Sequence, residues 1–228
     1  MRKYLVVVAG GRGLRMGGEV PKQFMPIGGR PVLMRTLQAF HDYDPQMTTA
    51  LVLPVSQMDY WHTLCAEYAF DLPYQLVEGG DTRFHSVYNG LHSLEAHGVA
   101  GGLVAVHDGV RPFVSAQVID ACYRQAAASG AAIPVVPVVD TLRHREQGGA
   151  SRTVDRADYC QVQTPQVFAG ALLLKAYAQP YTPAFTDDAS VVEHLGVEVA
   201  LVPGQRENIK LTTPFDMAVA QALLHADD

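Results

Sequence analysis

The stretch VVVAGGRGLRMGGEVPKQF occupies residues 6–24, where an apolar run that begins at Tyr4 passes straight into a loop with five glycines. Glycine adopts positive φ readily and lets a ligand approach the main chain without a Cβ in the way. Successive exposed N–H groups in such a loop form a concavity that binds anions. Arg15 and Lys22 add two cations, seven residues apart. The stretch therefore predicts a strand followed by a loop that binds a nucleotide or another phosphate compound.

The spacing within this loop does not match the two best-known nucleotide-binding patterns. The pattern G-x-x-x-x-G-K-S/T is absent, because Lys22 is followed by Gln23. The dinucleotide pattern G-x-G-x-x-G fails because Met16 stands at its sixth position, and no acidic residue follows roughly 20 positions later to bind a ribose. What remains, AGGxGxRM followed by PKQF, resembles the loop of nucleotidyltransferases that condense an NTP with a sugar or polyol phosphate. The alternative is an ordinary glycine-rich turn with charges that face solvent, which the cations of this loop disfavour.

Composition sets the broad class of the protein. A chain of 228 residues with 48% hydrophobic residues suits one continuous domain over residues 1–228. The net charge of −6 argues against a nucleic-acid partner, which normally needs a basic patch. Cys65, Cys122 and Cys160 form no C-x-x-C pair, so neither a zinc site nor a disulfide framework is expected. No signal peptide is visible and no apolar run approaches the roughly 20 residues that cross a bilayer, so we expect a cytoplasmic protein without a membrane partner.

Apolar periodicity predicts strands that alternate with helices along most of the chain. Leu33, Leu37 and Phe40, for example, share one face of a predicted helix that begins at Pro31. We predict strands over residues 4–8, 48–53, 74–77, 103–106 and 197–202, and helices from near residues 31, 56, 82, 171, 187 and 214. Such alternation implies right-handed crossovers. The expected fold is therefore a single doubly wound, mostly parallel α/β sheet of the Rossmann-like kind.

Polar or glycine-rich loops follow three of these strands, over residues 9–22, 78–86 and 107–112. In open α/β sheets, ligands bind in the crevice outside the carboxyl ends of the strands. We therefore expect the three loops to converge on one binding site.

Residues 140–156 interrupt the alternation, because they are polar and carry Gly148 and Gly149 at their middle. They predict a long β-hairpin that projects from the domain. One alternative is a mobile surface loop, and the other is an arm that embraces a second subunit. We favour the arm, and with it a homodimer.

Four polar residues stand where chemistry is expected. Asp108 ends a buried strand, and its carboxylate suits Mg²⁺, although a turn cap is the alternative. Arg111 follows and is able to hold a phosphate through a bidentate fork. His107 is interpreted as a structural hydrogen-bonding residue rather than a base. Lys210 ends a short extended run and is a candidate site residue; the alternative is a lysine that is simply solvated.

The second loop carries Gly79, Gly80, Asp81 and Ser86. Gly80 lets a flat base approach the backbone, with Asp81 or Ser86 bonded to the edge of that base. Arg83 follows in the first turn of a helix, where it is either a ligand residue or a surface residue.

These motifs together resemble one family. The set AGGxGxRMG, PKQF, GGDTRxxSV, HDGVRPF, DTL, TVDR, QTPQVF, TDDAS and NIKLTTPFD spans nearly the whole chain in order. It is similar to the 2-C-methyl-D-erythritol 4-phosphate cytidylyltransferases of the non-mevalonate isoprenoid pathway. The resemblance implies that CTP and the polyol phosphate give the CDP-linked polyol and pyrophosphate, with Mg²⁺.

The resemblance also implies roles for individual residues. Arg15, Lys22 and Lys210 would be catalytic and Asp108 would hold the metal. The nucleotide would lie against Ala9, Gly10, Gly11, Gly13, Gly80, Asp81, Ser86 and Gly109. The polyol phosphate would contact Arg111, Thr164 and Thr186, and also Thr141 and Arg156 from the neighbouring subunit. Three residues depart from the family pattern, because Gly10 and Gly109 stand where the family often has alanine and Leu14 is apolar.

Three other functions compete with this one. A ribitol 5-phosphate cytidylyltransferase has similar loops, but TVDR and TDDAS favour the methylerythritol enzyme. Another sugar-phosphate nucleotidyltransferase would prefer a different NTP. A non-catalytic nucleotide-binding module would have no need of Asp108 beside Lys22 and Lys210.

Overall fold

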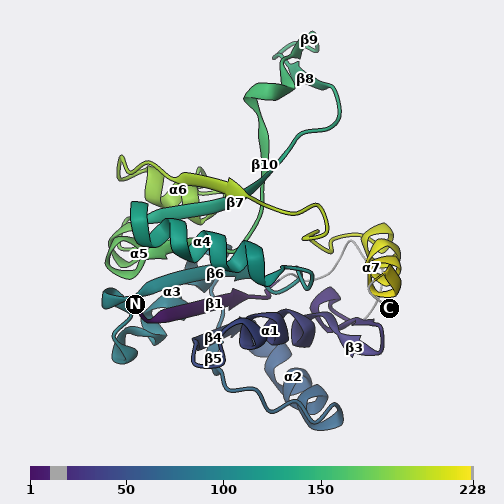
Figure 1. Ribbon diagram of the computed structural model, residues 1–228, viewed down its shortest axis with the longest axis vertical. Coiled ribbons are helices and arrows are strands. Elements are labelled where there is room, and N and C mark those ends of the chain that lie inside the picture. Colours follow the sequence, from purple (N-terminus) through teal and green to yellow (C-terminus); the bar gives the residue numbers. More distant parts are fainter. Residues whose placement is uncertain (11–19, 227–228) are drawn as a thin grey trace.

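The computed structural model describes residues 1–10 and 20–226. Within them the main sheet consists of β1 (Lys3–Val8), β4 (Thr48–Leu53), β5 (Gln75–Glu78), β6 (Leu103–Asp108), β7 (Ala131–Pro137), β10 (Cys160–Val162), β11 (Gln166–Ala169) and β12 (Ala200–Pro203). Their spatial order is β10-β7-β11-β6-β1-β4-β5, with β12 paired to β7 (Figure 1).

Most neighbouring strands of the sheet run parallel. Strand β1 lies between β4 and β6 and is parallel to both, with Val8 opposite Val52 and Asp108. Strands β4 and β5 are also parallel, and so are β7 and β12. Strand β11 lies antiparallel between β6 and β7, and β10 is antiparallel to β7. The prediction of a mostly parallel α/β sheet is confirmed.

Strands β7, β10 and β11 and the helix over Ala116–Ser129 were not predicted from the sequence. The segment between the arm and the helix near residue 171 carries no regular apolar alternation, and its pairing partners in β6 and β7 lie far away in the chain. Strand β5 begins at Gln75 rather than Tyr74, and β12 begins at Ala200 rather than Val197. These shifts of one to three residues leave the topology unchanged.

Helices cover both faces of the sheet. They are α1 (Val32–Tyr43), α2 (Val55–Glu67), α3 (Arg83–Ser93), α4 (Ala116–Ser129), α5 (Gly170–Tyr177), α6 (Asp188–Glu193) and α7 (Pro214–Ala226). Local caps fix where several of them begin. The Thr82 hydroxyl accepts a hydrogen bond from His85 N at the start of α3, and Asp187 and Ser190 form a capping box at the start of α6.

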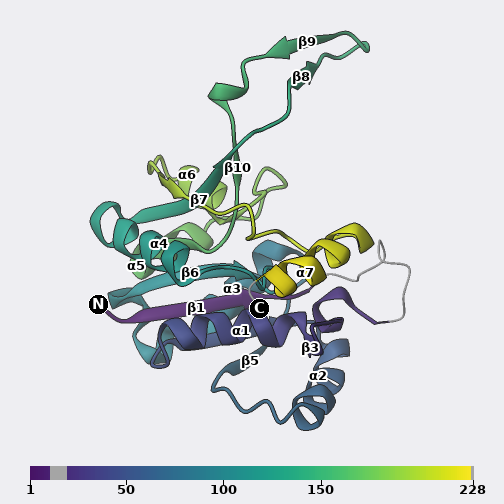
Figure 2. The same ribbon diagram turned by 45° about the vertical axis from the view of Figure 1, so that its right-hand side comes forward.

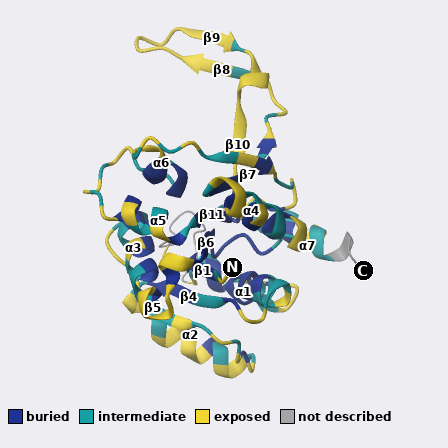
Figure 3. Cartoon of the chain, turned by 60° about the vertical axis from the view of Figure 1, so that its left-hand side comes forward, coloured by how far each residue is buried: buried dark blue, intermediate teal, exposed yellow. Residues whose placement is uncertain are grey.

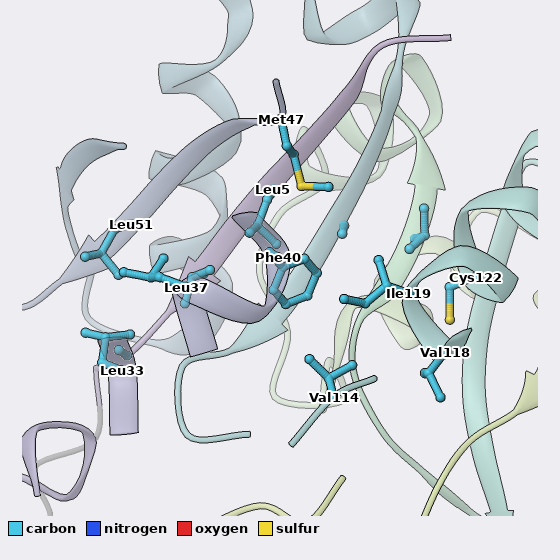
Figure 4. Packing of buried hydrophobic residues seen from close by; sticks show 14 of the residues in the cluster. Leu5, Leu33, Leu37, Phe40, Met47, Leu51, Val114, Val118, Ile119 and Cys122 are labelled. Atoms are coloured by element: carbon cyan, nitrogen blue, oxygen red, sulfur yellow. The ribbon is translucent and has the colours of Figure 1, made fainter. Parts of the chain in front are cut away.

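Alternate residues of β1 feed two separate hydrophobic cores, as the period of a strand requires. Leu5 and Val7 pack in a cluster with side chains from α1, α2 and α4, of which Figure 4 shows part. Tyr4 and Val6 pack in the other cluster with side chains from α3, α5 and α6. The sheet is therefore covered on both faces, as expected for a doubly wound fold.

A third, smaller cluster closes one end of the molecule. It joins α7 to the short hairpin of β2 (Pro26–Ile27) and β3 (Arg30–Pro31), with Ile27, Leu211 and Ala220 buried within it. This cluster holds the segment that contains Lys210 against the sheet, because Leu211 N donates a hydrogen bond to Val110 O.

The predicted arm projects far from the sheet as a hairpin of β8 (Leu142–Arg145) and β9 (Ser151–Val154), shown most clearly in Figure 2. Gly148 and Gly149 have φ of 104° and 92°, which lets the chain turn sharply between the strands. Nearly all of the arm is exposed (Figure 3).

No helix in the described ranges is both long enough and apolar enough to cross a membrane.

Candidate active site

A cleft of about 670 Å³ opens at the carboxyl ends of β1, β4, β5 and β6. It brings together parts of the three loops that the sequence analysis predicted to converge. Its lining includes the predicted residues Ala9, Gly10, Lys22, Gly80, Asp81, Ser86, Asp108 and Lys210. The segment after β4, from Leu53 to Gln57, lines the cleft as well. That segment was not predicted from the sequence to be part of the site. Strand β4 is parallel to its neighbours β1 and β5, so its end lies at the same edge of the sheet.

A buried amide joins the PKQF motif to the end of β1. Gln23 lies in the short 3₁₀ helix η2 (Lys22–Phe24) and is fully buried. Its Nε2 donates hydrogen bonds to Ala9 O at 3.0 Å and to Gln57 Oε1 at 2.5 Å. These contacts hold η2 against the end of β1 and the first turn of helix α2 (Val55–Glu67), and so place the adjacent Lys22 on the cleft wall.

Asp108 lies at the centre of a cluster of charges. Its Oδ2 is 3.1 Å from Arg111 Nε and 3.1 Å from Lys210 Nζ, and its Oδ1 is 3.9 Å from Arg83 Nε. Burial alone would raise the pKa of Asp108. The three cations outweigh burial and hold the pKa well below the usual range of a carboxyl group. Asp108 is therefore an anion at neutral pH, surrounded by an excess of positive charge.

His107 points to the opposite face of the sheet and is structural, as the sequence analysis interpreted it. Its ring packs edge-on against Phe40, and its two nitrogens lie 3.1 Å from Arg111 O and 3.0 Å from Thr164 Oγ1. Thr164 Oγ1 also accepts a hydrogen bond from Asp108 N at 3.1 Å. The carbonyl oxygen of Arg111 can only accept, so Nε2 carries a proton, and in the neutral ring Nδ1 accepts a hydrogen bond from the Thr164 hydroxyl. Burial lowers the pKa of His107 to about 4.

The GGDT loop lies tightly against the first turn of α3. Gly80 N donates a hydrogen bond to Ser86 Oγ at 3.1 Å, and the Ser86 hydroxyl donates to Thr82 O at 3.0 Å. A Cβ at Gly80 would lie 2.4 Å from His85 Cβ, so this position takes glycine. Asp81 is exposed at the mouth of the cleft.

The two glycines that depart from the family pattern have different surroundings. A Cβ at Gly109 would lie 2.8 Å from the Ala9 Cβ, so the backbones pack too closely for alanine here. A Cβ at Gly10 would meet its nearest neighbour, a Pro54 carbon, at 4.0 Å, so that position has room.

Several predicted residues do not line the cleft. Arg111 and Thr164 are buried beneath Asp108, and Arg111 Nη1 donates to Asn208 O at 2.8 Å. Thr186 is exposed, and its backbone N donates to Ser190 Oγ. Gly11, Gly13 and Arg15 lie outside the described residues.

The two predicted arm residues, Thr141 and Arg156, are exposed at the base of the arm, outside the cleft of their own chain. Arg156 Nη1 donates a hydrogen bond to Val139 O.

Sequence reasoning left Arg83 open and missed its partner. Arg83 makes a bidentate pair with the fully buried Asp188, at 2.9 and 2.7 Å. Because the two residues are 105 positions apart, their spacing along the chain carried no signal. The TDDAS motif was the one visible hint, since it placed two carboxylates in succession.

A doubly wound sheet, a strand-end cleft and cations gathered around one ionised carboxylate define a nucleotidyltransferase of the α/β class. Comparison with known proteins narrows this class. The chain belongs to the 2-C-methyl-D-erythritol 4-phosphate cytidylyltransferase family, whose model matches residues 4–226. The predicted resemblance is thereby confirmed.

Individual relatives agree with this assignment. The chain is 58% identical over 224 residues to the 2-C-methyl-D-erythritol 4-phosphate cytidylyltransferase of Phocaeicola vulgatus, covering 98% of this chain and 100% of the relative. It is also 58% identical, with the same coverage, to the enzyme of that name from Bacteroides fragilis. The crystal structure of the Thermus thermophilus enzyme matches with a TM-score of 0.77 at 36% identity, over 99% of this chain and all of the other.

Proposed function

We propose that this chain transfers the cytidylyl group of CTP to 2-C-methyl-D-erythritol 4-phosphate, with release of pyrophosphate. The observation that carries the proposal is the cluster of cations around Asp108 at the edge of a strand-end cleft. Family membership and the names of the relatives select this substrate pair over ribitol 5-phosphate or another sugar phosphate.

The reaction depends on positioning the two substrates and neutralising their negative charge, and it requires no covalent intermediate with the protein. An oxygen of the substrate phosphate attacks the α-phosphorus of CTP in line. The bond from that phosphorus to the β-phosphate oxygen breaks, and pyrophosphate leaves with the electron pair. Two polyanions repel each other, so cations that hold both supply most of the acceleration. We assign this task to Lys22 and Lys210 on the cleft wall, and to Arg15 on sequence alone.

The GGDT loop and the end of β1 are assigned to the nucleotide. Gly80, Asp81 and Ser86 all line the cleft. Ala9 and Gly10 approach from β1. The remaining loop glycines, Gly11 and Gly13, keep this role as an expectation from the sequence, and Gly109 supports it by letting two strand ends pack closely.

Asp108 fits a divalent cation such as Mg²⁺. In the described ranges, no group of three or more His, Cys, Asp or Glu side chains could hold a metal ion. A cation here would therefore take the Asp108 carboxylate and complete its shell with phosphate oxygens and water, which is the usual habit of Mg²⁺. Such an ion would neutralise phosphate charge when bound.

The polyol phosphate is assigned to the side of the cleft beneath Lys210. Arg111 and Thr164 support this side through Asp108, and Thr186, which lies outside the cleft lining, is assigned to the polyol phosphate from the sequence resemblance. Thr141 and Arg156 are exposed on the arm and outside the cleft of their own chain, which supports a role in the cleft of a second subunit.

The base of the arm also supports a homodimer. Val139, Tyr159 and Val162 are 55%, 49% and 42% exposed, although they are apolar or aromatic. A second copy would cover these side chains and order the arm over residues 140–156. We propose a single domain over residues 1–228 that dimerises through this arm and works in the cytoplasm.

Two experiments test the proposal. Pyrophosphate release is measured with CTP and each of the two polyol phosphates, and we expect turnover with methylerythritol phosphate and little with ribitol 5-phosphate. The reverse preference would contradict the assignment of the acceptor.

The shared site is tested by mixing variants. Arg156→Ala and Lys22→Ala homodimers should both be nearly inactive. If Arg156 acts across the interface, one site of each heterodimer carries both defects and the other is intact. Verified heterodimers should then recover up to about half of the wild-type activity, since a charge-stabilising donor typically contributes about 10²–10³ in rate. No recovery would show that Arg156 acts within its own chain.

A further inference from the structure

The Arg83 side chain lies between two carboxylates. Its Nη1 and Nη2 donate to Asp188 Oδ1 and Oδ2 at 2.9 and 2.7 Å, so the outer fork of the guanidinium is occupied. Its Nε faces Asp108 Oδ1 at 3.9 Å, beyond hydrogen-bond distance but close enough for attraction. Arg83 is also part of the cleft wall. The geometry thus links the central carboxylate of the cleft to a second, buried carboxylate.

Asp188 is a rigid anchor for this arginine. It is fully buried at the start of α6, and Tyr177 OH donates a hydrogen bond to its Oδ1 at 2.6 Å. The Tyr177 ring stacks on Phe84, at 4.7 Å between centroids, and Phe84 directly follows Arg83 in α3. The first turn of α6 is held in turn, because Ala189 N donates to Gln166 Oε1 at 2.8 Å.

Stability alone does not account for such a pair. Taking two charges out of water costs several kcal/mol per ion, and replacing a buried ion pair by apolar residues is often neutral or stabilising. What the pair does provide is a fixed direction, because a bidentate fork leaves the guanidinium one orientation. That orientation places Nε toward Asp108.

The two oxygens of Asp108 consequently have different surroundings. Oδ2 is within 3.1 Å of both Arg111 and Lys210. Among the described residues, none donates a hydrogen bond to Oδ1, which faces Arg83 at 3.9 Å. Arg83 therefore attracts Oδ1 from a distance at which it does not occupy the lone pairs of that oxygen.

We propose that Arg83, held by Asp188, is a positioning residue that fixes the Asp108 carboxylate with Oδ1 presented to a phosphate-bound divalent cation. The inference rests on the proposed function, because it assigns Asp108 to that cation. The Arg83–Asp188 pair also connects the two substrate sites. Arg83 directly follows the loop assigned to the nucleotide, and Asp188 lies shortly after Thr186, which is assigned to the polyol phosphate. The pair thereby ties the nucleotide side of the cleft to the polyol side.

The test separates positioning from stability with a double variant. Arg83→Met should lower Tm because it leaves the fully buried Asp188 carboxylate without its partner, and Asp188→Asn should lower it because the half-buried Arg83 guanidinium loses its bidentate partner. The double variant should regain most of the lost Tm. Its kcat should nevertheless stay about 10- to 100-fold below wild type, and its KM for CTP in Mg²⁺ should rise by about 10-fold, because the metal-bound nucleotide is held less well in both the ground state and the transition state.

A binding measurement provides a readout that does not depend on turnover. Calorimetry should show that in Mg²⁺ the double variant binds CTP about 10-fold more weakly than wild type, a loss of about 1.4 kcal/mol. In EDTA the two proteins should bind CTP equally well. Arg83→Lys keeps the charge without the bidentate fork, so it should retain Tm and still lose about 10-fold in kcat.

Lys3→Met is the matched control. Lys3 pairs with Asp44 at 3.0 Å and its side chain is 29% exposed, close to the 30% of Arg83, but it lies at the opposite end of β1. This variant should leave kcat and the effect of Mg²⁺ unchanged.

Wild-type kcat and unchanged Mg²⁺-dependent binding in the double variant would overturn the inference, and so would wild-type kcat in Arg83→Lys. If the double variant does not fold, Arg83→Lys decides alone. Failure of the proposed function looks different, since the wild-type protein would then neither bind CTP nor release pyrophosphate.

Discussion

Acid should destabilise the fold through His107 before it affects the buried carboxylates. Burial lowers the pKa of His107 from 6.5 to about 4, and the folded ring is neutral with both nitrogens bonded. The unfolded chain therefore binds a proton between these two values that the folded chain does not. Stability from this group is complete above pH 6.5 and is lost as the pH falls toward 4.

The size of the effect follows from the difference in pKa. A difference between 6.5 and about 4 corresponds to about 3 kcal/mol, because each pKa unit is worth about 1.4 kcal/mol. Most of this loss should be present at about pH 4.5. Asp108 and Asp216 have lowered pKa values, so their stabilisation is lost mainly below their unfolded value of 3.8. His107 can therefore be studied before they contribute.

The assay is urea unfolding in EDTA at several pH values from about 7.5 to about 4.5. His107→Gln replaces the ring with an amide that does not titrate, so its unfolding free energy should fall by about 3 kcal/mol less than that of wild type over this range. His144→Gln, at an exposed position on the arm, is the control and should follow wild type. Equal pH dependence in wild type and His107→Gln would refute the reasoning.

Three further variants test the cleft by direct kinetics. Lys22→Ala should lower kcat about 10²–10³-fold with an unchanged Tm, because a charge-stabilising donor is lost; a near-normal steady-state rate would remove Lys22 from the phosphate site. Asp108→Asn should require more Mg²⁺ for half-maximal rate, since an amide is a poorer ligand for a hard cation; a wild-type Mg²⁺ titration would make Asp108 a cap. Gly80→Ala should raise the KM for CTP more than that for the polyol phosphate, because its Cβ would lie 2.4 Å from His85 Cβ and displace the loop. Equal changes in both KM values would place Gly80 outside the nucleotide site.

The sequence predicted most of the features that local patterns determine, although α4 was missed despite Ser115 at its start and Gly130 at its end. The strands that precede the three loops are apolar runs, and the arm is a polar segment with two adjacent glycines, so both were visible along the chain. Strands β10 and β11 were not, because their pairing depends on β6 and β7 rather than on their own alternation.

The residues of the site also fall into those that the sequence indicated and those that it did not. Lys22, Gly80 and Asp108 stand in motifs beside glycine or at strand ends, which made them candidates. The bond between Arg83 and Asp188 is a tertiary contact between two helix starts, and a single sequence carries no local pattern for it. The buried position of Arg111 was also hidden, because the sequence shows the charge but not that Asn208 and Asp108 already engage it.

The pairing of β6 with β1 has a consequence for evolution of the site. Val7 stands opposite His107 and Val8 opposite Asp108. Successive side chains of a strand point to opposite faces, so a slip of one residue would exchange them. The imidazole would then stand among the cations and the carboxylate would meet the ring of Phe40. A single inserted or deleted residue within β6 would thus abolish the site without changing any of its residues, whereas length changes in the arm would leave this alignment intact.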